Sequence, residues 1–465
     1  MKKENIIQIT IIIVLSLILC VLVTLYFKSG ANSQSNMTGN GPSSQMEAPV
    51  QGGAQGGFGG PGGQNGGDNS NTVEKTGATE FTEEKSESNK IYESTNSDES
   101  AILVKDGGNA KISDSTVSKS SGDSSNVENS EFYGVNAGVL VTSGSQATLD
   151  NLDISTSAKG SNAVFSTGTD SKIYISNSKI ETTKDSSRGL DATYGGYIEA
   201  NNVEISTQGG SCATLATDRG EGTVIAKNST LSTAGSGSPV IYSTGDITLE
   251  DSTGKATGAQ MVVIEGKNTA TVTNSTLECS GKGNRNNVDN CGIMIYQSMS
   301  GDAGEGTGTL NATNSKLSIS SDSDYYKTAP LFFITNTKAI INLENNTLQY
   351  GSGILLKAQG TSEWGTSGNN GGEVTLNAKN QKLTGNIEAD NISTVEINLK
   401  ENSNLNGAIN TENTAKKIKL NIDSTSTLIL TGDTYVTELN DDDTTYSNIN
   451  LNGYKLYING TAIEK

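Results

Sequence analysis

Short runs in which apolar and polar residues alternate recur along this 465-residue chain. They share one motif: alternating apolar residues, an Asn or Asp, a small residue, any residue and a final apolar residue. Full copies lie at residues 112–117, 149–154, 175–180, 200–205, 226–231, 272–277, 312–317, 343–348 and 378–383, and degenerate copies at 249–254 and 400–405. Period-two alternation predicts strands that bury one face and expose the other. The chain is therefore expected to be a repeat protein.

Each repeat contains three short runs, as residues 172–196 illustrate. Two alternating Ile residues precede a turn at Asn177, Ile180 opens a second run, and LDAT at 190–193 forms a third. Asn tolerates the left-handed backbone of a tight turn, and its amide can bond the equivalent Asn one repeat away. Three strands per repeat, with the closest copies spaced 22–26 residues apart, predict an all-β fold, a right-handed parallel β-helix with an Asn ladder.

The third run is the most apolar in nearly every repeat, as in PVIY at 239–242, MVVI at 261–264 and LFFI at 331–334. A sheet of such runs is expected either to be covered or to form the thick side of the core. An array of β-sandwiches is the alternative architecture. It would require antiparallel hairpins with two-residue turns and would have no Asn ladder.

The composition divides the chain into four predicted segments. Residues 1–28 are predicted to be a cytoplasmic tip and transmembrane anchor, 29–77 a Gly/Ser/Asn/Gln-rich flexible linker, 78–410 the parallel β-helix repeats, and 411–465 a C-terminal β cap. The cap is expected because the last coil must cover an open core and an exposed strand edge.

The anchor prediction rests on the apolar run of residues 6–27, which two lysines precede. As a helix this run is long enough to cross the hydrocarbon core of a bilayer. A cleaved signal peptide is the alternative, but its apolar stretch would be shorter and would end in small residues. Lipid attachment at Cys20 would likewise require a small residue before it. The positive-inside rule then places the chain after residue 28 outside the cell, in a single-pass topology.

The composition excludes several kinds of chemistry. The chain has no histidine, which rules out Ser-His-Asp and Cys-His nucleophiles, His-ligated metals and an imidazole base. Its formal net charge of -19 argues against a nucleic-acid partner, because phosphate recognition requires clustered Lys and Arg. No cofactor or metal site is predicted. Calcium is the only ion considered, and the acidic loop Asp441, Asp442 and Asp443 is expected to be solvated rather than calcium-bound.

Polar residues at the ends of the third runs are the candidates for ligand binding. Stacking of successive third runs would place them along one ridge that mixes carboxylates, cations and aromatic rings, as sugar-binding clefts do. They are Arg188, Asp191, Tyr194, Asp218, Arg219, Tyr242, Glu265, Lys267, Tyr296, Gln297, Asp302 and Trp364. The alternative, which residue type alone favours, is that the turn residues satisfy backbone groups and that Trp364 plugs a loop. No catalytic residue is assigned.

Three cysteines follow the anchor. Cys279 and Cys291 bracket the loop 280–290. They are either joined by a disulfide in an oxidising exterior or two buried, small hydrophobic residues, and the sequence favours neither. Cys212 begins an earlier third run and is expected in the core.

Several segments of the repeat region together resemble the adhesin-like β-helix surface proteins of anaerobic bacteria, which are related to the pectin-lyase-like superfamily. The segments include RGLDATYGG at 188–196, GGSCATLATDRGEGTV at 209–224, SPVIYSTGDI at 238–247 and WGTSGNNGGEVTLN at 364–377. The resemblance extends from about Gly134 to the C-terminus. It implies a β-helix fold and a surface-displayed, non-catalytic protein of undefined ligand. β-Helical proteins that bind pectin or cellulose with calcium are more distantly similar, but their repeated Asp-Gly-Ile and Gly-Gly pattern is absent here.

The expected function is that of a membrane-anchored, extracellular protein of a bacterial cell membrane that binds a polysaccharide or another surface partner along one face, without catalysis. One alternative is a polysaccharide lyase-like or carbohydrate-binding protein acting on polyuronates. Lyases of this fold abstract a proton with Arg or Lys, assisted by calcium-bound Asp, and need no histidine; however, no cluster of Asp on adjacent strands is evident. A second alternative is a structural spacer of the envelope.

Overall fold

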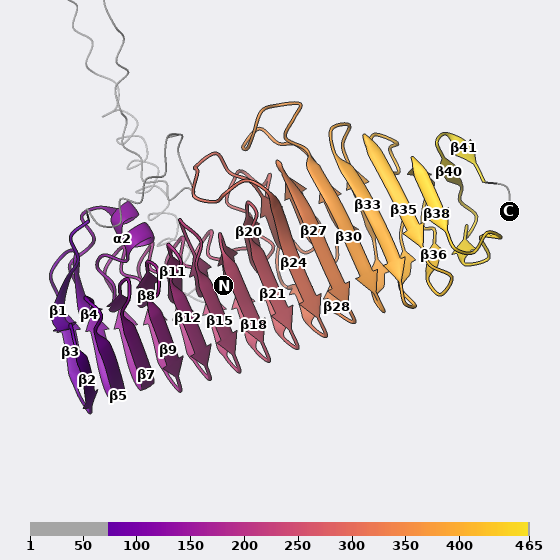
Figure 1. Cartoon of the computed structure of the whole chain (residues 1–465). Helices are drawn as coiled ribbons and strands as arrows, with labels where there is room; N and C mark the ends of the chain where they lie inside the picture. The colour runs from indigo at the N-terminus through magenta and orange to yellow at the C-terminus, as the bar shows by residue number, and fades with distance from the viewer. Residues whose placement is uncertain (1–72, 464–465) are drawn as a thin grey trace, which may run out of the picture. The chain divides into compact units, whose positions relative to one another are not determined.

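The computed structural model describes residues 73–463. This part of the chain is mostly β, and its strands stack coil upon coil in parallel sheets, consistent with a parallel β-helix (Figure 1). Among the described residues, the one antiparallel pair joins β40 (Leu456–Ile458) and β41 (Thr461–Ala462). The β-sandwich alternative, which requires antiparallel hairpins, is therefore wrong. The predicted anchor and nearly all of the predicted linker lie outside the described residues.

The third runs form one parallel sheet, called sheet A. Its order follows the chain, with one strand from each coil as far as β32. The strands are β1 (Thr76–Phe81), β4 (Glu99–Val104), β6 (Val139–Val141), β8 (Val164–Thr167), β11 (Leu190–Thr193), β14 (Leu215–Thr217), β17 (Ile241–Ser243), β20 (Val262–Glu265), β23 (Ile293–Tyr296), β26 (Phe332–Thr335), β29 (Ile354–Ala358) and β32 (Asn386–Ala389).

The first runs form one limb of a second sheet, sheet B. This first limb contains β2 (Glu84–Ser88), β5 (Asn109–Lys119), β7 (Gln146–Thr156), β9 (Lys172–Ser176), β12 (Tyr197–Asn201), β15 (Thr223–Lys227), β18 (Asp246–Glu250), β21 (Thr269–Thr273), β24 (Thr307–Thr313), β27 (Thr337–Glu344), β30 (Gly372–Lys379), β33 (Thr394–Lys400), β35 (Lys417–Ile422) and β38 (Glu438–Asp441). β5 and β7 continue through the turn, which is why both limbs belong to one sheet.

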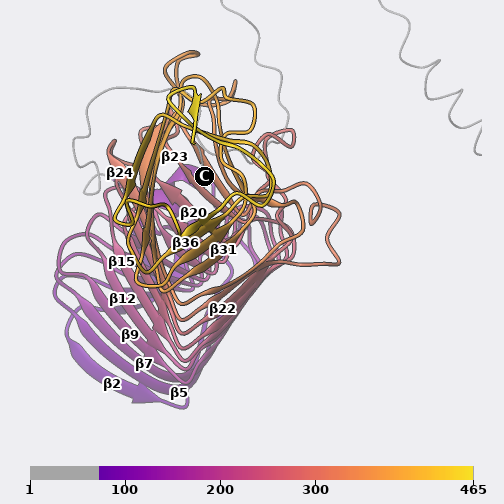
Figure 2. The ribbon, with the colours of Figure 1, turned by 90° about the vertical axis from the view of Figure 1, so that its right-hand side faces the viewer.

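The second runs form the other limb of sheet B and, towards the C-terminus, a separate sheet C. The second limb contains β3 (Ile91–Ser94), β10 (Lys179–Thr182), β13 (Glu204–Thr207), β16 (Thr230–Thr233), β19 (Thr253–Ala256), β22 (Thr276–Cys279), β25 (Lys316–Ile319) and β28 (Thr347–Gln349). Sheet C contains β31 (Lys382–Thr384), β34 (Asn404–Asn406), β36 (Thr427–Ile429) and β39 (Ile449–Asn450). Seen along the stack, the two limbs of sheet B meet at an angle (Figure 2).

The turn between the limbs is the one that the repeated motif predicts. The third motif residue of every copy has the left-handed backbone, from Asp114 with φ 49° to Asn380 with φ 46°. The predicted ladder of amides joins Asn202 to Asn177 at 2.8 Å and Asn345 to Asn314 at 2.8 Å. Elsewhere the bond shifts by one residue, as where Asn177 donates to Asp150 instead of Asn151. The Asn turn is therefore confirmed, and its ladder is continuous only in part.

A second, internal ladder explains the small polar residue that follows the turn in most copies. The backbone N–H of Ser229 donates to Ser252 Oγ at 2.9 Å, and that of Ser252 donates to Ser275 Oγ at 3.1 Å. Asn346 and Gln381 continue the same series with their side-chain oxygens. These oxygens satisfy N–H groups that the bend removes from the sheet, so the corner has few unpaired donors in the apolar interior.

The interior of the stack is one continuous apolar cluster of Val, Ile, Leu and Ala from all of the sheets. Strand alternation places Ile173, Ile198, Val224 and Ile247 in it at one level of successive coils. Rows of similar β-branched and aliphatic side chains fill most of the space between the sheets, with few aromatic rings such as Phe81, Tyr92 and Phe332, which agrees with the low aromatic content.

One short helix, α2 (Val127–Tyr133), interrupts the coils between β5 and β6. Asn126 caps its N-terminus by accepting from the Glu128 N–H at 2.9 Å, and Gly134 ends it with φ 70°. A Cβ at position 134 would meet the ring of Phe165 at 2.4 Å. This glycine therefore permits both the left-handed end of the helix and its close approach to sheet A.

The coils continue past the boundary predicted at residue 410. β35 pairs with β33 and β38 pairs with β35, both in parallel, so residues 417–441 extend sheet B. Only sheet D, made of β37 (Thr434–Val436), β40 and β41, departs from the pattern. The antiparallel end of the stack is confined to residues 456–462.

Candidate functional site

The candidate residues gather on the outer face of sheet A. Leu190 and Ala192 point into the interior cluster, so Asp191 between them points outwards. Strand register then extends an outward column through neighbouring coils. That column contains Leu103, Leu140, Phe165, Asp191, Ala216, Tyr242, Val263, Met294, Phe333, Lys357 and Glu388.

This outer face is covered over most of its length, which was one of the two outcomes expected for the third runs. From Leu103 to Phe333 every member of the outward column is buried. Ala137, after α2, packs with the first three members, and Trp364 packs with the later ones. The ridge is therefore not an open cleft, and most of the predicted ligand-binding side chains lie beneath loops.

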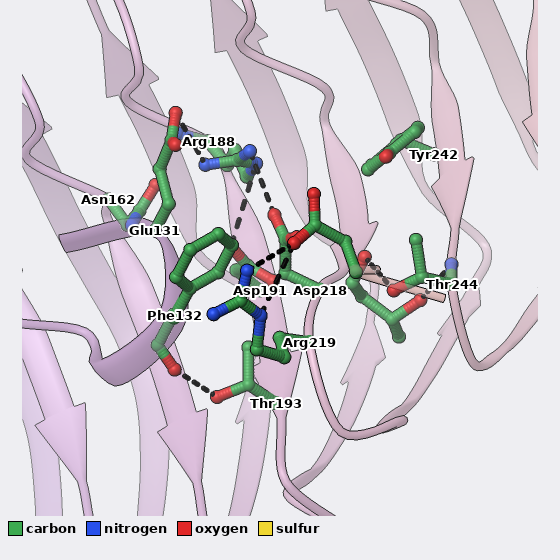
Figure 3. A network of polar contacts seen from close by, with 12 residues as sticks. Glu131, Phe132, Asn162, Arg188, Asp191, Thr193, Asp218, Arg219, Tyr242 and Thr244 are labelled. Atoms are coloured by element: carbon green, nitrogen blue, oxygen red, sulfur yellow. Dashed lines mark hydrogen bonds and ion pairs between the residues drawn. The ribbon is translucent and has the colours of Figure 1, made fainter. Parts of the chain in front are cut away.

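The structure brings four charged residues together between α2 and sheet A (Figure 3). We call them the arginine centre: Arg188, Asp191, Asp218 and, from α2 itself, Glu131. Arg188 Nη2 lies 2.8 Å from Asp218 Oδ2, and its Nε lies 3.6 Å from Asp191 Oδ2. Glu131, from α2, lies 3.6 Å from Arg188 Nη1. Asp191 is fully buried, and neither of its carboxyl oxygens accepts a hydrogen bond. One guanidinium thus faces three carboxyl groups.

Burial and mutual repulsion control the protonation of this centre. Burial raises the pKa of Asp191 to about 7, although the Arg188 charge opposes the shift. Burial also raises the pKa of Asp218 well above its usual range. Burial opposes the charge of Arg188, but the nearby carboxylates, Asp218 foremost, raise its pKa overall. A proton on one buried carboxyl therefore relieves the repulsion that a single guanidinium does not balance.

A second set of contacts ties α2 to the sheet beside the arginine centre. Thr193 Oγ1 donates to the Phe132 carbonyl at 2.8 Å, and the Arg219 guanidinium lies 3.9 Å from the centroid of the Phe132 ring. Arg219 also pairs with Asp302 at 2.6 Å, which brings in the loop after β23. Tyr194 stacks on Tyr133 of the helix, with ring centroids 5.5 Å apart. These contacts position the cover and leave Arg219 half-buried.

Glu265 is the centre of a separate buried cage. Tyr242 and Tyr296 donate their hydroxyl protons to Glu265 Oε2 at 2.8 and 2.7 Å, and Ser298 donates to Oε1. Burial raises the pKa of Glu265, while the three hydroxyl donors oppose the shift. Trp364 packs edge-on against Tyr296, with ring centroids 5.2 Å apart, and is only 6% exposed. The tryptophan therefore plugs a loop, and it offers no open platform to a sugar.

The remaining two candidates lie at the margin of the ridge. Lys267 is exposed and pairs with Glu221 at 2.7 Å. Gln297 is buried and donates to the Ala303 carbonyl at 3.2 Å, so it supports the loop rather than the surface. The Gln297 contact matches the alternative in which turn residues satisfy backbone groups, whereas the Lys267 contact is a surface ion pair between two side chains.

Sequence reasoning missed several residues of these clusters, among them Glu131, Phe132, Tyr133, Thr193 and Ser298. Thr193 lies two residues after Asp191 in the same LDAT run. Strand alternation therefore places both side chains on the outer face, and this signal was available in the sequence. Glu131 belongs to a helix inserted between strands, and Ser298 belongs to a loop. Neither repeat spacing nor alternation extends to such segments.

A small cavity of about 30 Å³ lies beside Trp364 and Tyr296, with Arg285 and Asp289 in its lining. A cavity of this size accommodates about one water molecule and no sugar ring. Asp191 and Asp218 do not line it.

The three cysteines among residues 73–463 are free and buried, so the disulfide alternative for Cys279 and Cys291 is not realised in this structure. Cys279 belongs to the interior cluster, whereas Cys291 belongs to the cluster on the outer face of sheet A. The two thiols thus lie in different apolar clusters. Burial raises the pKa of the Cys279 thiol to about 12, which keeps it protonated and unreactive near neutral pH. Cys212 is buried too, and its thiol donates to the Lys184 carbonyl.

Beyond Phe333 the outward column reaches the surface at Lys357 and Glu388. A groove of about 270 Å³ opens there, with Asp390 and Glu412 in its wall. Asp390 already accepts from the Gly360 N–H at 2.8 Å and from Ser393 Oγ at 2.6 Å. This carboxylate therefore serves the turn that follows β32.

Within residues 73–463 no three His, Cys, Asp or Glu side chains are arranged to hold a metal ion. The helical structure of that same range includes no segment with the length and apolarity needed to cross a bilayer. Comparisons with protein-family models, curated proteins and solved structures find no match to this chain.

Proposed function

We propose that this chain is an adhesin-like, right-handed parallel β-helix protein that is displayed outside a bacterial cell membrane and binds a carbohydrate or another surface partner without catalysis. The N-terminal 28 residues would anchor it, and residues 29–77 would give it reach. The apolar run of residues 6–27 and the Gly-rich composition that follows support this order.

The observation that supports a binding role is the uncovered outer face of the first limb of sheet B. Strand register joins its outward side chains into one column: Ser86, Lys111, Thr148, Tyr174, Glu199, Ile225, Thr248, Thr271, Asn311, Asn342, Asn377, Asn398, Asn421 and Asn440. From Lys111 onwards all of them are exposed or half-buried. A long face with regularly spaced polar groups suits an extended ligand better than a small substrate.

A non-catalytic role is proposed because loops bury the side chains that are best suited to acid-base chemistry. Asp191 and Glu265 are fully buried beneath loops, where a polysaccharide has no access to them. A general acid or base must lie within hydrogen-bond reach of the proton that it transfers.

The test uses the full chain, purified in detergent, on glycan arrays and on the surfaces of whole cells. Binding that exceeds that of an unrelated protein of the same net charge is the expected result. Equal binding by both proteins would overturn the proposal. Incubation with polygalacturonate and calcium tests the lyase alternative, and ultraviolet-absorbing unsaturated products would contradict a non-catalytic role.

A structural spacer is the second candidate, and the two ladders at the coil corners favour it. Hydrogen bonds from coil to coil through Asn202, Ser229 and Ser252 stiffen the stack whether or not a ligand binds. The spacer alternative predicts that substitutions on the outer face of the first limb change no binding.

A further inference from the structure

Six asparagines occupy one column on the outer face of the first limb. They lie on six consecutive strands of that limb, β24, β27, β30, β33, β35 and β38, and each of the last five donates to the side-chain oxygen of the one before it. The bonds are Asn342 to Asn311 at 2.8 Å, Asn377 to Asn342 at 2.8 Å, Asn398 to Asn377 at 2.8 Å, Asn421 to Asn398 at 2.6 Å and Asn440 to Asn421 at 2.8 Å. We call this set the amide column. It is distinct from the Asn turns at the coil corners.

The middle members of the amide column retain hydrogen-bonding capacity. A primary amide has two N–H donors and two acceptor lone pairs. Asn342, Asn377 and Asn398 each use one donor and one lone pair within the column. Each therefore has one donor and one acceptor left, and all three side chains are half-buried on an uncovered face. The remaining groups repeat once per coil in the same order.

Charged residues of both signs flank the amide column and form ion pairs with one another. Lys379 pairs with Glu344 at 3.3 Å and with Glu401 at 3.5 Å on one side. Lys419 pairs with Glu396 at 3.1 Å on the other side. The amide column itself is uncharged. This part of the face therefore gives a polyanion or a polycation no electrostatic advantage over a neutral hydrophilic chain.

The spacing of the amides is set by the sheet. Neighbouring strands lie roughly 4.8 Å apart, so alternate amides lie roughly 9.6 Å apart. This distance is comparable with the length of a disaccharide in an extended β-linked polysaccharide, whose hydroxyl groups both donate and accept. An extended chain lying along the stack can therefore meet equivalent amide groups at every second coil.

The geometry points to the amide column as the binding site of an uncharged, linear, β-linked polysaccharide that lies parallel to the stack. The inference rests on the proposed binding function and names its ligand class and its site. The N-terminal half of the same register column offers an internal contrast, because Lys111, Tyr174, Glu199 and Ile225 there repeat no single chemistry.

The experiment measures binding of the full chain, in detergent, to xylan and mannan as neutral probes and to polygalacturonate and chitosan as charged probes. The test variant combines Asn342→Val and Asn377→Val, since Val suits a strand and removes both amides. The control variant combines Thr148→Val and Thr248→Val in the N-terminal half of the column. A third variant, Thr375→Arg, leaves the amides in place and overhangs them with a long side chain from the same strand face.

Binding to a neutral probe, insensitive to salt, is expected for the wild type and the control. At least tenfold weaker binding is expected for the double Asn variant and for Thr375→Arg. Equal binding by all four proteins would overturn the amide column as the site and leave the proposed binding function intact. Binding only to a charged probe, with a steep dependence on salt, would overturn the ligand class. Binding to no probe and no cell surface would overturn the proposed function as well.

Discussion

The outer face of sheet A and the outer face of the first limb of sheet B have the same strand pattern but different surroundings. Both alternate one buried and one outward side chain. On sheet A the outward positions hold Asp191, Tyr242 and Glu265, and inserted loops bury them. On the first limb the outward positions hold residues such as Thr271, Asn342 and Asn377, which remain accessible.

The difference lies in where the insertions occur. The long spacings between motif copies fall between the second and third strands, as with α2 before β6 and the loop before β23, or directly after the third strand. Those positions flank sheet A and leave the first limb uncovered. Charged groups on sheet A must therefore be paired in a desolvated setting, whereas those on the first limb are screened by water.

The largest expected effect comes from Arg188→Met in the arginine centre. Removing the guanidinium leaves Asp191, Asp218 and Glu131 without their buried partner, which is expected to lower the free energy of unfolding by about 3–5 kcal/mol. Urea unfolding of the full chain, followed by circular dichroism, measures this. Lys267→Met is the matched control, because it removes an exposed cation from the pair with Glu221. Equal loss in the two variants would mean that burial does not determine the cost of removing the cation.

The pH dependence of stability should differ between the faces as well. The pKa of Asp191 is raised in the folded state to about 7, above the unfolded value of about 3.9, so its contribution is fully present below about pH 4 and is lost as pH rises through about 7. Wild-type melting temperature is therefore expected to fall between about pH 4 and about pH 8. Asp191→Asn should flatten this fall and stabilise the chain at the upper end.

Thermal unfolding across that range measures the effect, and Asp246→Asn on the exposed face of the first limb is the control. A profile of Asp191→Asn that is parallel to that of the wild type would show that another group titrates instead.

A smaller effect is expected at the corner between the limbs. Asn274 has φ 49° and donates to Asp251 at 3.1 Å. Ala at this position should cost about 1–2 kcal/mol because a Cβ without a compensating polar group disfavours the left-handed backbone. Gly should restore most of the loss, since it adopts that conformation freely. Thermal unfolding of the Ala and Gly variants distinguishes the two contributions, and equal losses would point to the amide bond alone.

The smallest effect is expected on the first limb. Lys338 and Glu373 lie 3.4 Å apart, and both side chains are more than half exposed. Lys338→Met should change the free energy of unfolding by about 0.5 kcal/mol or less, because water screens the pair. Urea unfolding at low and high salt measures it. A loss comparable with that of Arg188→Met would contradict the comparison of the two faces.

The repeated motif was sufficient to predict the strands and turns of the coils that contain it. Asn at the third motif position, as at Asn274, requires only local backbone preference, and the alternation of Ile173 and Ile175 requires only a buried face. Both kinds of information are contained within a few residues. The stacking in parallel coils followed from their repetition.

The repeated motif could not predict whether the candidate ridge would be covered by other segments. Alternation placed Asp191 and Glu265 outside the core, but whether an outward side chain is covered depends on segments such as residues 127–133 and Trp364, which follow no period. The amide column, in contrast, had a signal. Asn311, Asn342 and Asn377 each precede the turn Asn of their own coil by three residues, so alignment on the turn would have placed them in one row.

The height of a coil is small compared with the length of chain that it contains. Two motif copies 23 residues apart, such as those ending at 254 and 277, enclose a contour of roughly 75 Å when extended, but they add only about 4.8 Å to the stack. A load applied to the end of the chain would meet the coils one after another rather than all at once. The extended contour of each detached coil would be many times longer than the rise that the coil had added to the stack. The remaining coils would stay folded.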